Sequence, residues 1–277
     1  MIGAIAGDII GAPYEFNNIK TTDFNIFNKD SYFTDDTVMT VANAKWILES
    51  LHSTDKYSLV KLEECMVEIA EKHRNAGYGG MFYRWLFQYE SFVTKDGKRV
   101  TKRMPYNSYG NGSAMRISPV GWAFDTLEET LNVAEISAEI TRNHIEGIKG
   151  AQATAAAIFL ARTGKSKGDI KSFVEQSFEY NLNRKCDDIR PYYEFNETCQ
   201  GTVPEAIIAF LESTDFENSI RLAVSLGGDS DTLACITGGI SEAFYGIPDN
   251  FISFANSFLT EDLKTVIEDF YKTFIYK

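Results

Sequence analysis

Cysteine and histidine are both rare in this chain, with four Cys and three His among 277 residues. The cysteines form no C-x-x-C pair and no close cluster. This pattern favours reduced, buried thiols over a disulfide framework, and we therefore expect a cytoplasmic protein. No apolar run approaches membrane-spanning length, so no membrane partner is expected. The apolar start MIGAIAGDIIGAPYE (1–15) lacks a basic leading region and is interrupted by Asp8, which indicates part of the fold rather than a signal peptide.

Basic residues are outnumbered as well. The chain has 27 Lys and Arg against 39 Asp and Glu, a formal net charge of −12. This balance argues against nucleic acid or an anionic membrane as the main partner. An anionic small molecule would need cations or backbone amides supplied locally. The main basic run, TKDGKRVTKR (94–103), predicts a solvated loop or a short hairpin, with a docking surface for an acidic partner as the alternative.

What the sequence has in abundance is helical periodicity. Apolar residues recur at i, i+3, i+4 and i+7 in the stretches 59–70, 127–138 and 263–274. GAQATAAAIFLAR (150–162) is apolar nearly all round and predicts a helix buried on most sides. PEAIIAFLES (204–213) places Pro204 in the first turn of another helix. Alternating strands are scarce. We predict an all-α fold, a compact single-domain orthogonal helix bundle over residues 1–277 with long loops, and expect a monomer.

Two segments concentrate carboxylates and hydroxyls, FTDDT (33–37) and GGDSDT (227–232). Helix capping is one interpretation of each, since Asp and Thr are favoured caps and first-turn acids complement the helix dipole. One cap, however, needs only one acceptor, and each segment supplies two carboxylates plus hydroxyls. Neither segment itself contains His or Cys, and such clusters suit Mg²⁺, Mn²⁺ or Ca²⁺ rather than zinc. Brought together in space, the two would form a binuclear site.

Two other interpretations of the second segment fit less well. An EF-hand needs Gly and Glu at loop positions that here hold Ala234 and Ile240. The DxDxT nucleophile motif of haloacid-dehalogenase-like phosphotransferases lies after an N-terminal strand, with further elements downstream. In this chain a short remainder follows Asp231, and its pattern predicts helix.

Four motifs, in this order, resemble those of the ADP-ribosylglycohydrolase family, which includes dinitrogenase-reductase-activating glycohydrolases and ADP-ribosyl-acceptor hydrolases. They are GAIAGDIIGAPYE (3–15), FTDDT (33–37), GNGSAMR (110–116) and GGDSDT (227–232), with TRNHIEGIKGAQA (141–153) as a weaker fifth. The resemblance implies an all-α fold around a cleft that holds two Mg²⁺ ions, or Mn²⁺ in their place. It implies catalytic roles for Glu15, Asp36 and Asp231. The metal ligands it implies are Thr34, Asp35, Asp36, Asp229, Asp231 and Thr232.

The resemblance also implies a pocket for ADP-ribose. Two glycine-rich segments, 75–80 and 107–116, offer backbone N–H groups that can approach a diphosphate, although simple turns are the alternative for both. Tyr78 and Tyr109 present flat faces for adenine or ribose. Of the other histidines, His52 and His73 are expected at the surface. The contacts implied are Gly77, Tyr78, Gly79, Ser108, Tyr109, Gly110, Asn111, Gly112, Ser113, Met115 and His144.

The implied function is hydrolysis of the bond between C1″ of ADP-ribose and an acceptor on a modified protein or small molecule, through an oxocarbenium-like transition state. ADP-ribosyl-arginine is the first expectation, with serine, acetyl, polymer and nucleobase conjugates as alternatives. A non-catalytic ADP-ribose-binding relative, or a site for another nucleoside- or phosphate-bearing molecule, also stays open. We expect the loops near Glu15, 17–32 and 180–200 to select the acceptor, with 181–206 as a rim over the cleft.

Overall fold

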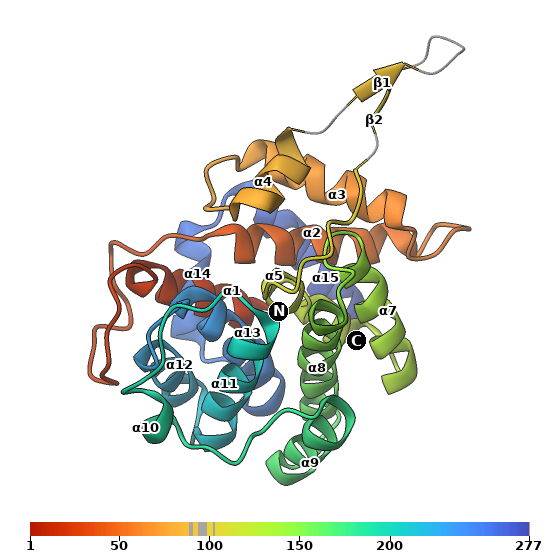
Figure 1. Ribbon diagram of the computed structural model, residues 1–277. Helices are drawn as coiled ribbons and strands as arrows, with labels where there is room; N and C mark the ends of the chain where they lie inside the picture. Colours follow the sequence, from red (N-terminus) through yellow and green to blue (C-terminus); the bar gives the residue numbers. More distant parts are fainter. Residues whose placement is uncertain (89–90, 94–98, 102, 277) are drawn as a thin grey trace.

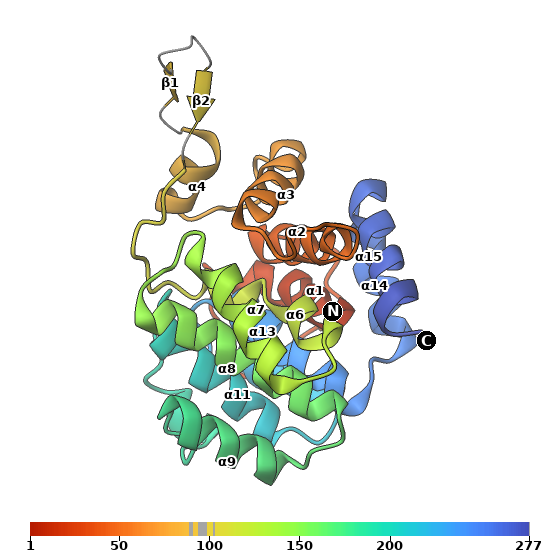
Figure 2. The ribbon, with the colours of Figure 1, turned by 90° about the vertical axis from the view of Figure 1, so that its right-hand side faces the viewer.

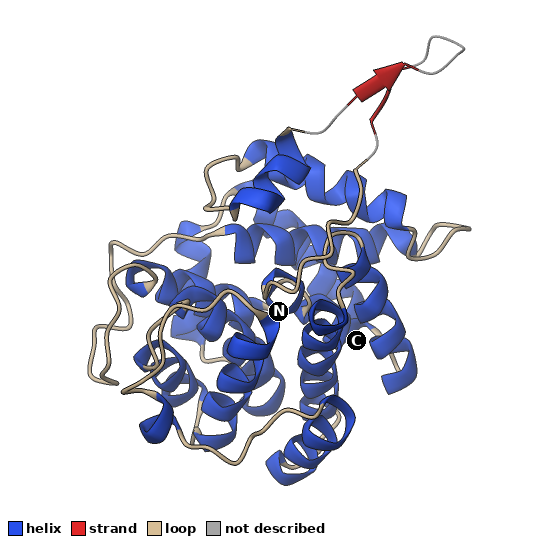
Figure 3. Ribbon diagram, viewed as in Figure 1, coloured by secondary structure: helices blue, strands red, loops and turns tan. Residues whose placement is uncertain are grey.

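Helices form nearly all of the regular structure (Figure 1, Figure 3). The computed structural model describes residues 1–88, 91–93, 99–101 and 103–276. The predicted all-α fold is confirmed. In chain order the helices are α1 (Ile2–Gly11), the 3₁₀ turn η1 (Ala12–Tyr14), α2 (Asp35–Ser50), α3 (Leu59–Lys72), α4 (Gly80–Phe87), α5 (Gly112–Met115), α6 (Ser118–Ala123), α7 (Leu127–Glu139), α8 (Ile145–Arg162), α9 (Lys167–Phe178), α10 (Cys186–Ile189), α11 (Cys199–Glu212), α12 (Phe216–Ser225), α13 (Ser230–Tyr245), α14 (Asp249–Phe258) and α15 (Glu261–Phe274).

A short hairpin is the exception to the helical pattern within these residues. β1 (Ser91–Val93) pairs antiparallel with β2 (Arg99–Thr101), and Figure 1 shows the pair projecting beyond α4. The structure agrees with the hairpin interpretation of the basic run for 99–101, whereas 94–98 and 102 lie outside the described residues. Arg103, which ends the run, is not solvated. Its guanidinium donates to Glu63 at 2.8 Å and its side chain is 6% exposed.

The periodic stretches of the sequence are all helical. α3, α7 and α15 cover the three amphipathic patterns, and α8 is buried along most of its Ala-rich run. The prediction for Pro204 is wrong, because α11 begins upstream of it at Cys199. Thr198 caps the helix there by accepting the Gly201 N–H at 3.1 Å. Pro204 therefore lies buried inside the helix rather than in its first turn.

α1 and α13 run antiparallel in close contact at the centre of the fold. Every residue of α1 is buried. A Cβ on Gly7 would lie 2.0 Å from the Ala234 carbonyl oxygen, and a Cβ on Gly11 would lie 2.5 Å from that of Ser230. Only glycine permits backbones to approach so closely. The contact sets the C-terminal end of α1 against the N-terminal end of α13.

The other helices complete the core around this pair. α8, α11 and α12 pack against α13, while α2 and α14 pack against α1. Figure 2 shows α3, α9 and α15 towards the outside of the molecule. The buried apolar side chains of the described residues form one continuous cluster. In the same part of the chain, no helix has the length and apolar character needed to cross a lipid bilayer.

Gly7→Ala tests the contact between α1 and α13. We expect the free energy of unfolding to fall by about 2–3 kcal/mol, because the clash with backbone outweighs the helix propensity that alanine gains. Denaturant unfolding measures the change. The control is Gly168→Ala in α9, where a Cβ meets only Ser166 Oγ at 3.7 Å. The free energy of unfolding of Gly168→Ala should be unchanged or higher. An equal decrease in both variants would show that the loss in Gly7→Ala does not come from the contact between α1 and α13.

Candidate metal centre

An acidic cluster forms where three chain segments converge, at the end of α1 and the starts of α2 and α13. Its members are Glu15 after η1, Asp35 and Asp36 in the first turn of α2, and Asp229 and Asp231 at the start of α13. The N-terminal ends of α2 and α13 both carry partial positive charge, which favours carboxylates at these positions. The structure therefore brings together the two segments that the sequence analysis paired.

The carboxylates are close enough to share a cation. Glu15, Asp229 and Asp231 each offer one oxygen, and these three oxygens lie within 4.8 Å of one another. Asp36, on α2, contacts the same cluster, because the hydroxyl of Thr232 on α13 donates to its Oδ2 at 3.3 Å. Its Oδ1 is buried and has no hydrogen-bond partner in the described part of the structure. Because such an oxygen is costly to bury without a partner, it indicates a place for a positive ligand.

Burial and mutual repulsion raise the pKa values of the acidic cluster. The pKa of Glu15 rises to about 8, first through burial and then through Asp231. The same two causes raise the pKa of Asp35 to about 7, and burial raises that of Asp229 to about 6. Burial is also the main cause that raises the pKa of Asp36 and of Asp231. Ionised carboxylates at this density need a cation, and oxygen donors of this kind fit Mg²⁺ or Mn²⁺.

Asp8 is a site residue that the sequence analysis missed. It lies on α1, fully buried, and its carboxylate accepts the N–H of Thr34 at 3.0 Å and its hydroxyl at 2.7 Å. The N–H and hydroxyl of Thr37 donate to the same carboxylate. Asp8 thereby orients the first turn of α2, which carries Asp35 and Asp36. The available signal was a lone carboxylate inside an apolar helix.

The two predicted hydroxyl ligands already have partners within the protein. Thr34 Oγ1 accepts the Asp36 N–H at 3.3 Å, so the capping interpretation holds for this residue. Thr232 Oγ1 donates to Asp36, as described above. The side chain of Asp229 does not cap α13; it accepts a hydrogen bond from Asn111 Nδ2 at 2.6 Å. Metal coordination by Thr34 and Thr232 stays a prediction.

Two consecutive glycines turn the chain into α13. Gly227 and Gly228 have φ values of 74° and 69°, a conformation that disfavours other residues. Asn18 brackets the turn, accepting the Gly228 N–H at 2.7 Å and donating to its carbonyl at 3.0 Å. The loop after Glu15 is thus tied to the residues just before Asp229.

The glycine-rich loop at 108–113 borders the acidic cluster through Asn111. Its amides are partly engaged, since the N–H of Gly110 bonds to Ser108 Oγ at 3.1 Å and that of Asn111 bonds to the Glu197 carbonyl at 2.7 Å. These two groups are therefore not open to a diphosphate. Tyr109 is 48% exposed, as a flat binding face requires.

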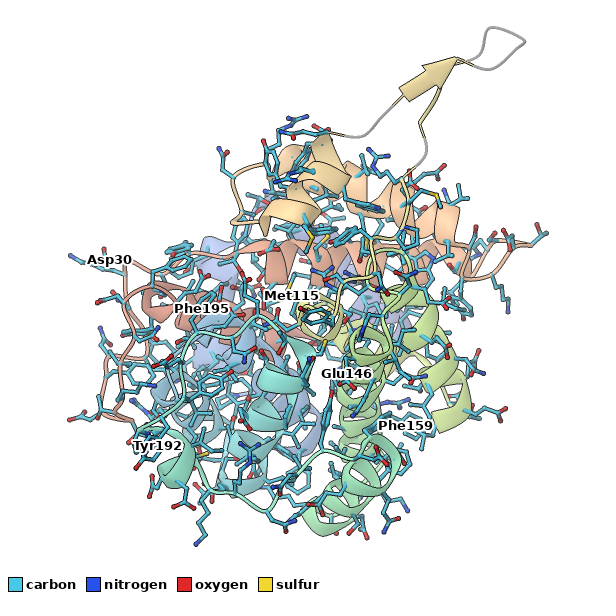
Figure 4. All side chains as sticks on the ribbon, in the orientation of Figure 1. Asp30, Met115, Glu146, Phe159, Tyr192 and Phe195 are labelled. Carbon is cyan, nitrogen blue, oxygen red and sulfur yellow. The ribbon has the colours of Figure 1, made fainter. Side chains whose placement is uncertain are left out.

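Several other residues predicted to contact ADP-ribose lie in the interior. Ser113 donates to the Gly147 carbonyl at 2.7 Å, and Met115, labelled near the middle of Figure 4, is buried. Tyr78 is also buried, and its hydroxyl bonds to the His73 carbonyl at 3.0 Å. By contrast, a Cβ at Gly77 or Gly79 would meet open space. Contact between these residues and ADP-ribose stays a prediction.

Arg142 is a second residue that the sequence analysis missed. Its side chain is buried, and its Nε has no hydrogen-bond partner in the described residues. A Cβ on Gly112 would lie 2.1 Å from its Nη2, so the guanidinium packs against the glycine-rich loop. It also partly offsets the rise in the pKa of Asp35. Its Nη1 donates to Thr141 Oγ1 at 3.1 Å, so this cation is held against the loop within electrostatic reach of Asp35.

His144 and His73 both have structural partners. His144 caps α8, where its Nδ1 accepts the Glu146 N–H at 3.1 Å, and its ring contacts Tyr109 edge-on at 5.3 Å. The predicted contact between His144 and ADP-ribose stays a prediction. The expectation of a surface position was wrong for His73, whose side chain is 9% exposed and pairs with Asp262 at 3.1 Å. His52 is exposed, as expected.

Comparison with known proteins decides the family. The family model for ADP-ribosylglycohydrolase matches residues 1–274. The chain belongs to the ADP-ribosylglycohydrolase family. It is an enzyme of that glycosidic-bond-cleaving class, as the resemblance of its motifs implied.

Relatives span most of the chain at low identity. ADP-ribosylhydrolase ARH3 of Mus musculus is 24% identical, over 89% of this chain and 83% of its own. An uncharacterized protein of Archaeoglobus fulgidus is 26% identical over 91% of this chain and 88% of its own. ADP-ribosylarginine hydrolase Tri1 of Pseudomonas putida is 25% identical over 50% of this chain and 39% of its own. A solved ADP-ribosylglycohydrolase-related protein complex shares the fold, with a TM-score of 0.71, 21% identity and coverage of 98% and 96%.

Asp8→Asn should loosen the metal centre without removing a ligand. The amide cannot accept from all four donors, so we expect a loss of about 1–3 kcal/mol in unfolding free energy and a 10- to 100-fold weaker affinity for Mg²⁺. Thermal unfolding and Mg²⁺ titration calorimetry measure the two effects. The exposed Asp23→Asn is the matched control. Unchanged Mg²⁺ affinity in Asp8→Asn would show that this carboxylate does not orient the cluster.

The metal-free protein should lose stability as pH rises from about 5 to 8. The folded state keeps a proton on Glu15 up to a pKa of about 8, whereas the unfolded chain releases it near pH 4. The folded state therefore binds more protons in this window, and its stability falls until the folded pKa is passed. Thermal unfolding in EDTA measures the slope; Glu15→Gln should reduce it, and Mg²⁺ should oppose it. A flat profile in EDTA would contradict the repulsion described above.

Proposed function

We propose that this protein is a metal-dependent hydrolase that cleaves the bond between C1″ of ADP-ribose and an arginine side chain of a modified protein. The observation that carries the proposal is the set of oxygens from Glu15, Asp229 and Asp231 within 4.8 Å of one another. Membership of the family supports the ADP-ribosyl chemistry. The Pseudomonas putida relative, an ADP-ribosylarginine hydrolase by name, supports arginine as the acceptor.

The acidic cluster would hold two Mg²⁺ ions, or Mn²⁺ in their place. Its carboxylates on α2 and α13 are the ligands proposed, with Thr34 and Thr232 as hydroxyl ligands. The fit rests on the buried Asp36 Oδ1, which has no donor in the described residues, and on the raised carboxyl pKa values. When bound, such ions supply Lewis acidity that makes water more acidic and orients ribose hydroxyls.

The protein's own groups then account for the bond changes. Water adds to C1″ and the C1″–N bond breaks through an oxocarbenium-like transition state. The carboxylates of Asp36 and Asp231 stabilise the positive charge that develops on the sugar. Glu15 takes the proton from water and returns it to the leaving guanidine nitrogen, a role for which a pKa close to the working pH is best suited.

The anionic part of the substrate needs positive charge within an acidic protein. We assign this to Arg142, a buried guanidinium beside the glycine-rich loop and next to the acidic cluster. Arginine presents planar, paired donors that suit phosphate oxygens. The loop residues Tyr109 and Gly112 would lie along the same part of the ligand.

Release of free ADP-ribose from an arginine-ADP-ribosylated protein tests the proposal. We expect release with Mg²⁺ and none with EDTA. Asp231→Asn should lower kcat by about 10²–10³-fold with an unchanged circular dichroism spectrum, because it removes charge at the reacting carbon. The control is Asp187→Asn, whose carboxylate is 87% exposed and pairs with Arg190.

The alternative outcomes separate the parts of the proposal. Full turnover by Asp231→Asn would refute the mechanism. Release from serine or acetyl conjugates but not from arginine would refute only the acceptor. Binding of ADP-ribose without release from any conjugate would favour a non-catalytic binding protein.

A further inference from the structure

Two exposed phenylalanines stack on each other beside the acidic cluster. Phe16 follows Glu15 directly and is 82% exposed, and Phe195, from the loop before α11, is 44% exposed. Their ring centroids are 5.9 Å apart, with 23° between the ring planes. We call this pair the aromatic ledge. Figure 4 labels Phe195 on the loop that crosses the front of the molecule.

The ledge lies on ordered loops, so its exposure is not a sign of fraying. Lys20, close after Phe16, donates to the Tyr193 carbonyl at 2.6 Å. On the other side of Phe195, the Glu197 carbonyl accepts the Asn111 N–H at 2.7 Å. Two large apolar rings held in water by braced loops cost hydration free energy, and such patches commonly mark a binding surface.

The position of the ledge connects it to the leaving group. If the reaction occurs at the oxygens of Glu15, Asp229 and Asp231, the acceptor is attached to the reacting carbon at that point. Glu15 is the partly exposed member of this set, whereas Asp229 and Asp231 are buried, so an acceptor that extends towards solvent passes Glu15, and Phe16 is the next residue. The ledge is therefore placed beside the path of the acceptor rather than beside the diphosphate.

Charge at the ledge favours a cationic occupant. Glu194 and Glu197 flank Phe195 and are exposed. Asn111 connects Glu197 to the acidic cluster, since its N–H donates to the Glu197 carbonyl at 2.7 Å and its Nδ2 donates to Asp229 at 2.6 Å. The nearby cation Lys20 is directed at backbone carbonyls of Tyr193 and Leu226. The mouth of the site thus combines flat apolar faces with carboxylates.

A guanidinium has both properties that this surface selects. It is planar, weakly hydrated and positively charged, so it stacks on aromatic rings while pairing with carboxylates. A serine acceptor has neither a planar group nor a charge at the side chain, and an acetyl acceptor is planar but small and uncharged. A nucleobase is planar, but its nucleic-acid phosphates would meet the acidic rim.

We propose that the aromatic ledge of Phe16 and Phe195, with Glu197, is the acceptor subsite and binds the guanidinium of the modified arginine. This inference rests on the proposed function. It assigns to two loop residues the selection of the acceptor, separately from the groups that hold ADP-ribose.

The test compares two peptides of the same sequence, one ADP-ribosylated on arginine and one on serine. Phe16→Ala and Phe195→Ala should raise KM for the arginine conjugate by about 3- to 30-fold and leave kcat unchanged. Values for the serine conjugate should not move. Phe16→Tyr should keep the wild-type KM for the arginine conjugate. Phe16→Leu, which keeps the bulk but not the ring, should raise this KM as Phe16→Ala does. Tyr192→Ala is the matched control, since this ring on the same loop is 85% exposed and lies away from Phe195 in Figure 4.

The outcomes separate the ledge from the proposed function. Equal losses on both conjugates, or no loss on the arginine conjugate, would overturn the ledge while the hydrolase stands. A nucleobase-linked conjugate serves as a third substrate, and an effect of the ledge variants confined to it would overturn the guanidinium assignment. If the wild type cleaves no conjugate, the proposed function fails. Binding measured by calorimetry then tests whether the aromatic ledge binds the guanidinium. Intact ADP-ribosyl-arginine should then bind more tightly than free ADP-ribose, and Phe16→Ala should abolish that difference; equal binding in the wild type would overturn it.

Discussion

The backbone contact between α1 and α13 is the constraint on which the site depends. At Gly7 and Gly11 the two helices approach so closely that no side chain fits between them. This contact fixes the position of each helix along the other, and the two helices run in opposite directions. Consequently the end of α1 meets the start of α13, and Asp8 and Glu15 lie at the same end as Asp229. A larger spacing would place these carboxylates too far apart to share a cation.

The acidic cluster makes the centre of the molecule costly to fold without a ligand. The cluster contains five carboxyl groups from three segments. Burial and the repulsion between these groups raise their pKa values. The N-terminal ends of α2 and α13, the amide of Asn111 and the guanidinium of Arg142 each offset part of this cost. A bound divalent cation would offset much more. Stability and function are therefore coupled at one place, as is common where binding sites store unfavourable charge.

Charge is distributed by region rather than by the average of the chain. In a chain with a net charge of −12, an anionic small molecule needs cations or backbone amides supplied locally. In the structure, Arg142 is buried beside the glycine-rich loop, whereas Glu15, Asp36, Asp229 and Asp231 gather in the acidic cluster. In the proposed function, the guanidinium of Arg142 would face the phosphates of the substrate and the carboxylates near Glu15 would face a cationic acceptor.

The sequence by itself determined the all-α class, several of the helices and the two halves of the acidic cluster. Periodicity is local, so α3, α7, α8 and α15 could be located from it, and paired carboxylates without His or Cys indicate a hard cation regardless of the fold. Tertiary structure decided what depends on distant partners. In the sequence, Asp8 only interrupts an apolar run, and its role appears from its hydrogen bonds with Thr34 and Thr37 in the fold. Likewise, nothing in the sequence distinguishes Arg142 from other cations, and its role appears from its packing against Gly112. The stacking of Phe16 on Phe195 joins residues far apart in the chain, and no local pattern encodes that contact.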